Sequence, residues 1–167
     1  VVLGNPPYQS AIAHKKSKGR DYRDRIKEKY ASITGTWDIY IPFFEAGINF
    51  LKPNGILSYI SPNKFLSATY GIGLRQYLSR ETRILTLADV SHLPIFESAS
   101  VYPVISVFKK SQATSSYPFA LLLPLSRESQ FSADGYSLGE QDSSSLTFLP
   151  DNLWGFLLSP NLEVLKA

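Results

Sequence analysis

The residues best suited to chemistry lie near the start of the chain, where a short apolar run ends in Asn5-Pro6-Pro7-Tyr8. Proline fixes its own φ angle and restricts the residue before it, so this pair holds the Asn5 side chain in a nearly fixed pose. An amide oxygen and a nearby carbonyl oxygen can together accept both hydrogens of an exocyclic amino group. An aromatic ring beside them can stack on the base that carries this amino group. The four residues suit methyl transfer to a planar amine, although a proline-stiffened turn without chemistry looks the same.

Strands and helices alternate in the segments that must position this motif. Apolar runs predict strands over 1–4, 56–60, 84–90 and 104–108, with a helix over 38–52 and another around 74–78. Since Pro42 is tolerated only in a first turn, the longer helix is expected to start near Ile41. The alternation is typical of parallel crossover units and predicts an α/β fold. Ligands of open α/β sheets bind beyond the carboxyl ends of strands, where the Asn5 loop would lie.

The composition excludes several classes of site. The 167 residues contain no cysteine, so the chain has neither disulfides nor thiolate metal sites. His14 and His92 are far apart and lack the spacing of metal ligands, so no metal site is predicted. No apolar run is long enough to cross a membrane and no signal-peptide pattern opens the chain. A cytoplasmic location without membrane attachment is therefore expected.

Positive charge is concentrated directly after the Asn-Pro-Pro-Tyr motif. Residues 14–29 contain eight Lys or Arg and three Asp or Glu, a charge of +5, whereas the whole chain carries +3. A short helix is expected within this segment, near 22–30. The basic loop from Lys15 to Lys29 is a candidate surface for phosphate groups, although a merely solvated loop would have the same composition.

Asn5-Pro6-Pro7-Tyr8 and four segments after it match the motifs of one enzyme family in the same order. Asn5-Pro6-Pro7-Tyr8 resembles the catalytic motif of methyltransferases that use S-adenosylmethionine, above all the adenine-N6 DNA methyltransferases. Next in that family come a helix with an aromatic residue that borders the cofactor, a Leu-Lys-Pro-x-Gly turn, a Leu-Arg-x-x-Leu helix and a loop phenylalanine. The matching segments here are 37–45, 51–62, 74–78 and 94–110. The likeness covers 1–110 and is nearest to the methylase cores of type II restriction–modification enzymes.

The resemblance implies a role for each matched residue around the target base. The Asn5 side-chain oxygen and the Pro6 carbonyl would accept the two N6 hydrogens of an adenine flipped out of duplex DNA. Tyr8 would stack on one face of this adenine and Phe96 on the other. Asn5, Pro6, Pro7, Tyr8 and Phe96 are thus the predicted catalytic residues.

The cofactor side of the site is represented by a single matched residue. The resemblance implies that Phe43 borders the adenine of S-adenosylmethionine, whereas its neighbour Phe44 is expected in the core. Double-stranded DNA would be the partner of the basic loop.

The glycine-rich cofactor loop of this family lies upstream of the catalytic motif, and Gly71-Ile72-Gly73 is expected to be only a helix-entry turn. The sequence therefore predicts a partial Rossmann-like methyltransferase sheet that lacks its first cofactor-binding strands. Residues 1–110 would be the catalytic half, and 111–167 a linker and bridge toward a DNA-recognition region. The first strand would be an exposed edge, through which a homodimer could form. Such a chain is expected to be inactive on its own.

The second half of the chain gives weaker signals. Another strand is predicted over 117–125, whereas the serine-rich residues 126–145 are expected to be irregular.

Two other functions fit parts of the sequence. Amino-methyltransferases of RNA or of protein glutamine use the same motif or a close variant, and a non-catalytic DNA-binding remnant needs no cofactor loop. The basic insertion and the Phe96 segment favour DNA methylation over the first. The missing cofactor motifs favour the remnant.

Overall fold

Helices and strands alternate in the first half of the chain and give way to strands in the second. The computed structural model describes residues 1–8, 20–95, 101–112, 114–148 and 153–158. Within these ranges the elements are β1 (Val2–Gly4), α2 (Arg20–Lys29), α3 (Tyr40–Phe50), β2 (Ile56–Pro62), the 3₁₀ turns η1 (Asn63–Leu66) and η2 (Thr69–Gly71), α4 (Ile72–Glu81), β3 (Thr82–Asp89), β4 (Pro103–Lys110), β5 (Pro118–Pro124), β6 (Tyr136–Asp142), α5 (Ser145–Phe148) and the 3₁₀ turn η4 (Trp154–Leu158). No helix among these residues is long and apolar enough to cross a bilayer.

The strands of the described residues form one mixed sheet in the order β1-β2-β4-β3-β5-β6. β1 runs parallel to β2, and β3 runs parallel to β5. The remaining neighbours are antiparallel: β4 lies between β2 and β3 and runs opposite to both, and β5 and β6 form a hairpin. The α/β class is confirmed, but the sheet is not built from parallel crossovers alone. Parallel neighbours need a crossover, usually a helix, and the structure describes none between β3 and β4.

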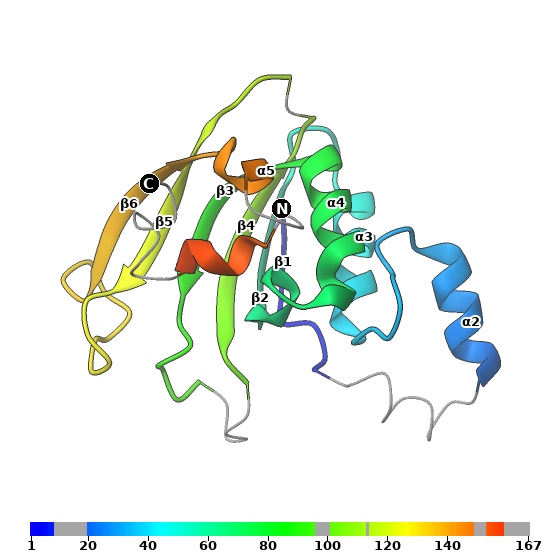
Figure 1. The fold of residues 1–167 in the computed structure, drawn as a ribbon, viewed down its shortest axis with the longest axis horizontal. Coiled ribbons are helices and arrows are strands. Elements are labelled where there is room, and N and C mark those ends of the chain that lie inside the picture. The colour runs from blue at the N-terminus through cyan, green and yellow to red at the C-terminus, as the bar shows by residue number, and fades with distance from the viewer. Residues whose placement is uncertain (9–19, 96–100, 113, 149–152, 159–167) are drawn as a thin grey trace.

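α3 and α4 lie together over one side of the sheet, while α2 stands away from it (Figure 1). α3 connects β1 to β2, and its residues 41, 44 and 48 are completely buried, as expected of an apolar face with helical spacing. Gly71 ends the η2 turn and α4 begins at the next residue, which confirms the predicted helix-entry turn. α3 and α4 contact each other, and the Tyr77 hydroxyl of α4 donates a 3.0 Å hydrogen bond to Asn49 Oδ1 of α3.

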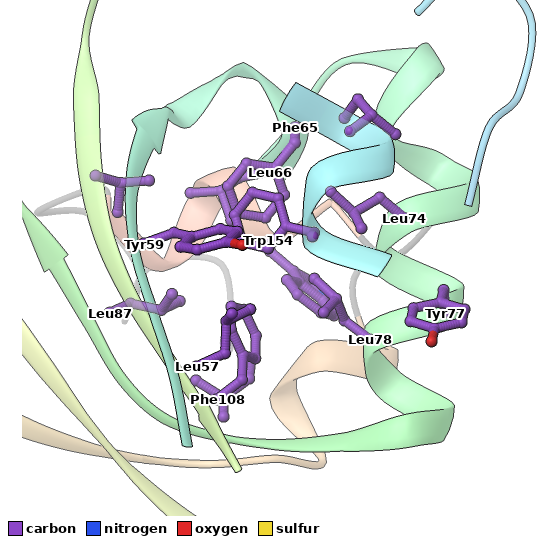
Figure 2. Close-up of a cluster of buried hydrophobic side chains, with 14 of the residues drawn as sticks. Leu57, Tyr59, Phe65, Leu66, Leu74, Tyr77, Leu78, Leu87, Phe108 and Trp154 are labelled. Atoms are coloured by element: carbon purple, nitrogen blue, oxygen red, sulfur yellow. The ribbon is translucent and has the colours of Figure 1, made fainter. Parts of the chain in front are cut away.

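A cluster of aromatic rings forms the centre of the core between α3 and the sheet. The Phe44 ring lies 5.2 Å from that of Tyr59, 5.1 Å from that of Phe65 and 6.0 Å from that of Phe108, measured between centroids. Trp154 reaches the same cluster from the η4 turn and is completely buried (Figure 2). Because distant segments meet on these rings, the turn at 154–158 shares one core with the first two strands.

β5 confirms the strand predicted over 117–125, whereas β6 corrects the irregular structure expected over 126–145. Residues 136–142 pair with β5 as an antiparallel hairpin. Most β6 side chains are exposed, so the strand lacks the alternation of apolar and polar residues that predicts one.

β1 lies at the end of the sheet, and β2 is the one strand of the described residues that pairs with it. The side chains of Val1 and Leu3 are 86% and 74% exposed. The predicted exposed edge is therefore confirmed for this part of the chain.

We expect Trp154→Ala to reduce the free energy of unfolding by about 3–5 kcal/mol, because it empties a fully enclosed indole site. Chemical denaturation monitored by circular dichroism measures the loss. Phe50→Ala is the matched control: its ring is 84% exposed, so its removal should change stability by less than about 0.5 kcal/mol. A loss below about 1 kcal/mol for Trp154→Ala would show that the η4 turn does not belong to the core.

Candidate active site

The Asn-Pro-Pro-Tyr loop leaves the carboxyl end of β1 and is held at both of its ends. Before it, β1 pairs with β2 through Gly4 and Tyr59. After it, the Tyr8 hydroxyl donates a 3.1 Å hydrogen bond to the carbonyl of Ile60. Burial raises the pKa of Tyr8 to about 12, so this hydroxyl remains a donor at neutral pH. Pro6 is buried, while the side chain of Asn5 is exposed. The loop thus exposes Asn5 to solvent, while the residues on either side of it are held in place.

Phe43 and Phe44 are adjacent on α3 but have opposite surroundings. Phe44 is completely buried, whereas 41% of Phe43 is exposed. The backbone carbonyl of Phe43 accepts a hydrogen bond from the Tyr59 hydroxyl, with 3.4 Å between the oxygens. The prediction that Phe44 is the core residue of the pair is confirmed, and the neighbouring ring is partly exposed to solvent.

Two of the predicted site residues, Tyr8 and Phe43, are both hydrogen-bonded to β2. Tyr8 bonds to β2 directly, and Phe43 bonds to the residue before that contact point. Phe96 lies outside the described residues, so the structure does not place it relative to the others.

Hydroxyl groups hold the start of α3 against the η2 turn. The hydroxyls of Tyr40 and Tyr70 lie 3.0 Å apart, and Tyr70 donates to Asp38 Oδ2 at 3.0 Å. Burial is the largest cause that raises the pKa of Tyr70 to about 12, and it also raises the pKa of Tyr40. Thr34 Oγ1 donates to the Tyr70 carbonyl at 3.2 Å. Of these residues, Thr34 and Tyr70 line an open hollow of about 530 Å³.

A buried arginine fixes the loop that follows β2. Arg75 of α4 is completely enclosed, and its Nη1 donates to the carbonyls of Phe65 at 2.6 Å and Ala68 at 3.0 Å. A Cβ atom built on Gly71 would lie 2.8 Å from the same nitrogen. Glycine at this position therefore allows the guanidinium to reach the turn.

A buried glutamate fastens the segment that follows the basic helix α2. Glu45 of α3 is 6% exposed and accepts hydrogen bonds from the backbone N–H groups of Ala31, at 3.2 Å, and Ser32, at 2.7 Å. In α2 the guanidinium of Arg23 lies over the Trp37 ring at 5.3 Å from its centroid. The helix is thus attached to α3 at its carboxyl end, while the side chains of Lys27 and Lys29 remain exposed.

Sequence reasoning did not single out Tyr59, Glu45 or Arg75. Each is buried, and its polar group has a backbone partner. The signal that could have found Glu45 is its place in the middle of the otherwise apolar helix at 40–50. For Tyr59 the signal is two glycines, at 4 and 47, on the elements that flank its strand.

Comparisons with known proteins show which family this chain resembles. Residues 1–96 match the sequence model of the Eco57I restriction-modification methylase family. RM.Eco57I of Escherichia coli, a type II restriction enzyme and methyltransferase, is 32% identical over 110 residues, which cover 66% of this chain and 11% of that protein. The type II methyltransferase M.XhoI of Xanthomonas vasicola is 31% identical over 115 residues, which cover 68% of this chain and 20% of that protein.

The fold is also found in a solved structure. The type IIG restriction endonuclease BpuSI superposes with a TM-score of 0.65 at 15% identity, covering 99% of this chain and 22% of the other.

The chain spans about a tenth to a fifth of the length of the curated relatives above. On the match over residues 1–96, and on its identity with these relatives, the chain belongs to the Eco57I restriction-modification methylase family.

Proposed function

We propose that these residues form the methyl-acceptor side of a DNA adenine-N6 methyltransferase of a restriction–modification system. The observation that carries the proposal is the presentation of Asn5, whose exposed amide projects from a loop fixed by the buried Pro6 and by the Tyr8 hydroxyl. Membership of a methylase family and the names of the relatives supply the reaction class.

In the proposed reaction Asn5 and Pro6 orient the nucleophile. The Asn5 side-chain oxygen and the Pro6 carbonyl accept the two hydrogens of the adenine N6 group, which directs the nitrogen lone pair toward the methyl donor. The base must leave the duplex to reach this loop, and the Tyr8 ring stacks on its face. Phe96 is proposed for the opposite face.

S-adenosylmethionine supplies an electrophilic methyl group when it is bound. The chain offers one residue that fits this cofactor, because Phe43 exposes an aromatic face of the kind that stacks on an adenine ring. We therefore assign Phe43 to the cofactor side of the site.

DNA affinity is assigned to the basic segment that follows the catalytic loop. Lys27 and Lys29 occupy the last turn of α2 and are exposed. The anchor through Glu45 holds this turn at a defined place relative to α3. Contacts from such lysines to phosphates release counterions and carry no sequence information.

We expect Asn5→Ala to reduce methyl transfer to DNA at least about 100-fold, because one of the two acceptors of the N6 hydrogens is lost. The assay supplies tritiated S-adenosylmethionine and unmethylated DNA to the longest natural polypeptide that contains residues 1–167. Mass spectrometry of the digested DNA then identifies N6-methyladenine. Residues 1–167 alone, assayed in parallel, should transfer no label.

Gln76→Ala is the control for this variant, since Gln76 is an exposed amide on α4. Its transfer rate should match that of the unmodified protein. Label that appears in RNA or in protein glutamine instead of DNA would contradict the proposed substrate. Equal rates for Asn5→Ala and the unmodified protein would contradict the proposed role of Asn5.

We expect Lys27→Ala combined with Lys29→Ala to weaken DNA binding uniformly across DNA sequences. Two phosphate contacts would be lost, so the slope of log affinity against log salt should become shallower by about 2. Fluorescence anisotropy of labelled duplexes at several salt concentrations measures this slope. Lys52→Ala is the matched control, because this lysine is exposed and follows α3. It lies before the amino end of β2, whereas Asn5 follows the carboxyl end of the parallel strand β1. An unchanged slope in the double variant would exclude α2 from the DNA interface.

A further inference from the structure

Tyr59 occupies the space between the end of β1 and the first turns of α3. It lies opposite Gly4 in the parallel ladder of β1 and β2. Its hydroxyl reaches the Phe43 carbonyl at 3.4 Å, and its ring meets that of Phe44 edge-on. Only 7% of the residue is exposed, and Figure 2 shows it among the buried rings of the core.

The two elements that Tyr59 separates both carry glycine where they face it. A Cβ atom built on Gly4 would lie 3.0 Å from Tyr59 Cε1, which is closer than nine in ten real contacts of this kind. A Cβ atom built on Gly47 would lie 2.5 Å from the Tyr59 hydroxyl oxygen. Neither φ angle is in the left-handed region, so space rather than backbone conformation favours glycine here. The Tyr59 side chain therefore occupies space that a side chain at either position would need.

We infer that Tyr59 is a positioning residue that sets the distance between the catalytic loop and the cofactor-side helix. Gly4 immediately precedes Asn5, and Tyr59 bonds to the backbone of Phe43, so one ring separates the two halves of the proposed site. The next residue of β2, Ile60, bonds to Tyr8 at the far end of the loop. Consecutive residues of one strand thus fix both ends of the loop, and one of them also fixes α3.

This inference rests on the proposed function, because spacing matters only if Asn5 and Phe43 act on two reactants. Transfer of a group between two bound molecules requires the reacting atoms to approach within about 3–3.5 Å, and a displacement of about 1 Å can cost on the order of 100-fold in rate. Tyr59 itself touches neither reactant in this scheme. Its substitution should therefore alter kinetic constants through α3 and β1 together.

The test uses the full-length protein and three variants at this contact. Tyr59→Phe removes the long hydrogen bond and should raise KM for S-adenosylmethionine about threefold to tenfold with kcat nearly unchanged. Tyr59→Leu empties the space beneath Gly4 and should lower kcat on the order of 100-fold. Gly47→Ala forces a methyl group against the hydroxyl and should raise the same KM.

Combining Gly47→Ala with Tyr59→Phe is the decisive experiment. The second substitution removes the oxygen that the new methyl group would meet. It leaves Leu57 Cδ1 at 2.7 Å and the ring carbon Cζ of residue 59 at 3.1 Å, so the Leu57 side chain must still shift. KM for the double variant should return to within about twofold of that of Tyr59→Phe alone. This rescue would show that the added methyl group acts on KM through the Tyr59 oxygen.

Two controls separate positioning from stability. Tyr77→Phe removes a hydroxyl that bonds to α3 from the opposite side, and Phe108→Leu removes a buried ring from the same cluster. With rates normalised to the folded fraction, both should leave KM and kcat unchanged. Unchanged constants in Tyr59→Leu, or no rescue in the double variant, would overturn the inference while leaving the proposed function intact. Absence of transfer by the unmodified protein would overturn the proposed function instead.

Discussion

The candidate site depends on a short parallel ladder in which β1 pairs with β2 at three positions, from Val2 and Leu57 to Gly4 and Tyr59. So few backbone pairs stabilise a strand weakly on their own. Side chains of β2 add the missing constraints, since Tyr59 packs against the end of β1 and the Ile60 carbonyl binds the Tyr8 hydroxyl. The position of Asn5 is thus determined by the strand next to it as much as by its own.

Buried polar groups determine the loops at the carboxyl edge of this ladder. Glu45 binds two backbone N–H groups, Arg75 binds two carbonyls, and Tyr70 links Asp38 to Tyr40. Hydrogen bonds to charged groups contribute about 1.5–3 kcal/mol each, and removal of one partner leaves a buried group unsatisfied. These loops are therefore organised before any ligand arrives, which reduces the entropy lost on binding.

The sequence was sufficient for the elements whose apolar residues follow a regular spacing. The helix expected over 38–52 is α3 at 40–50, and the strands around 56–60, 84–90, 104–108 and 117–125 are present with slightly different ends. β6 was not predictable, because its exposed side chains leave no alternation to detect. The antiparallel return of β4 was missed as well, since strand order depends on contacts between distant segments and not on local spacing.

The site was predictable only in part, for a related reason. Motif residues such as Asn5, Tyr8 and Phe43 can be identified by type and order, and their catalytic roles stay predictions. The polar residues that hold them, Glu45 and Arg75 among them, follow ordinary helical spacing and show their role only once the partner carbonyl or N–H group is known.

α3 is the common reference for the three surfaces of the proposed function. Phe43, the residue proposed for the cofactor side, lies on this helix, and Glu45 of the helix binds the segment that follows α2. Gly47 of the same helix faces the Tyr59 side chain, which separates it from β1. The proposed phosphate contacts of α2 and the proposed orienting contacts of Asn5 would act on different properties, namely DNA affinity and the rate of transfer. A displacement of this helix would change all three surfaces together, whereas a change on α2 alone would alter DNA affinity and leave the geometry of transfer as it is.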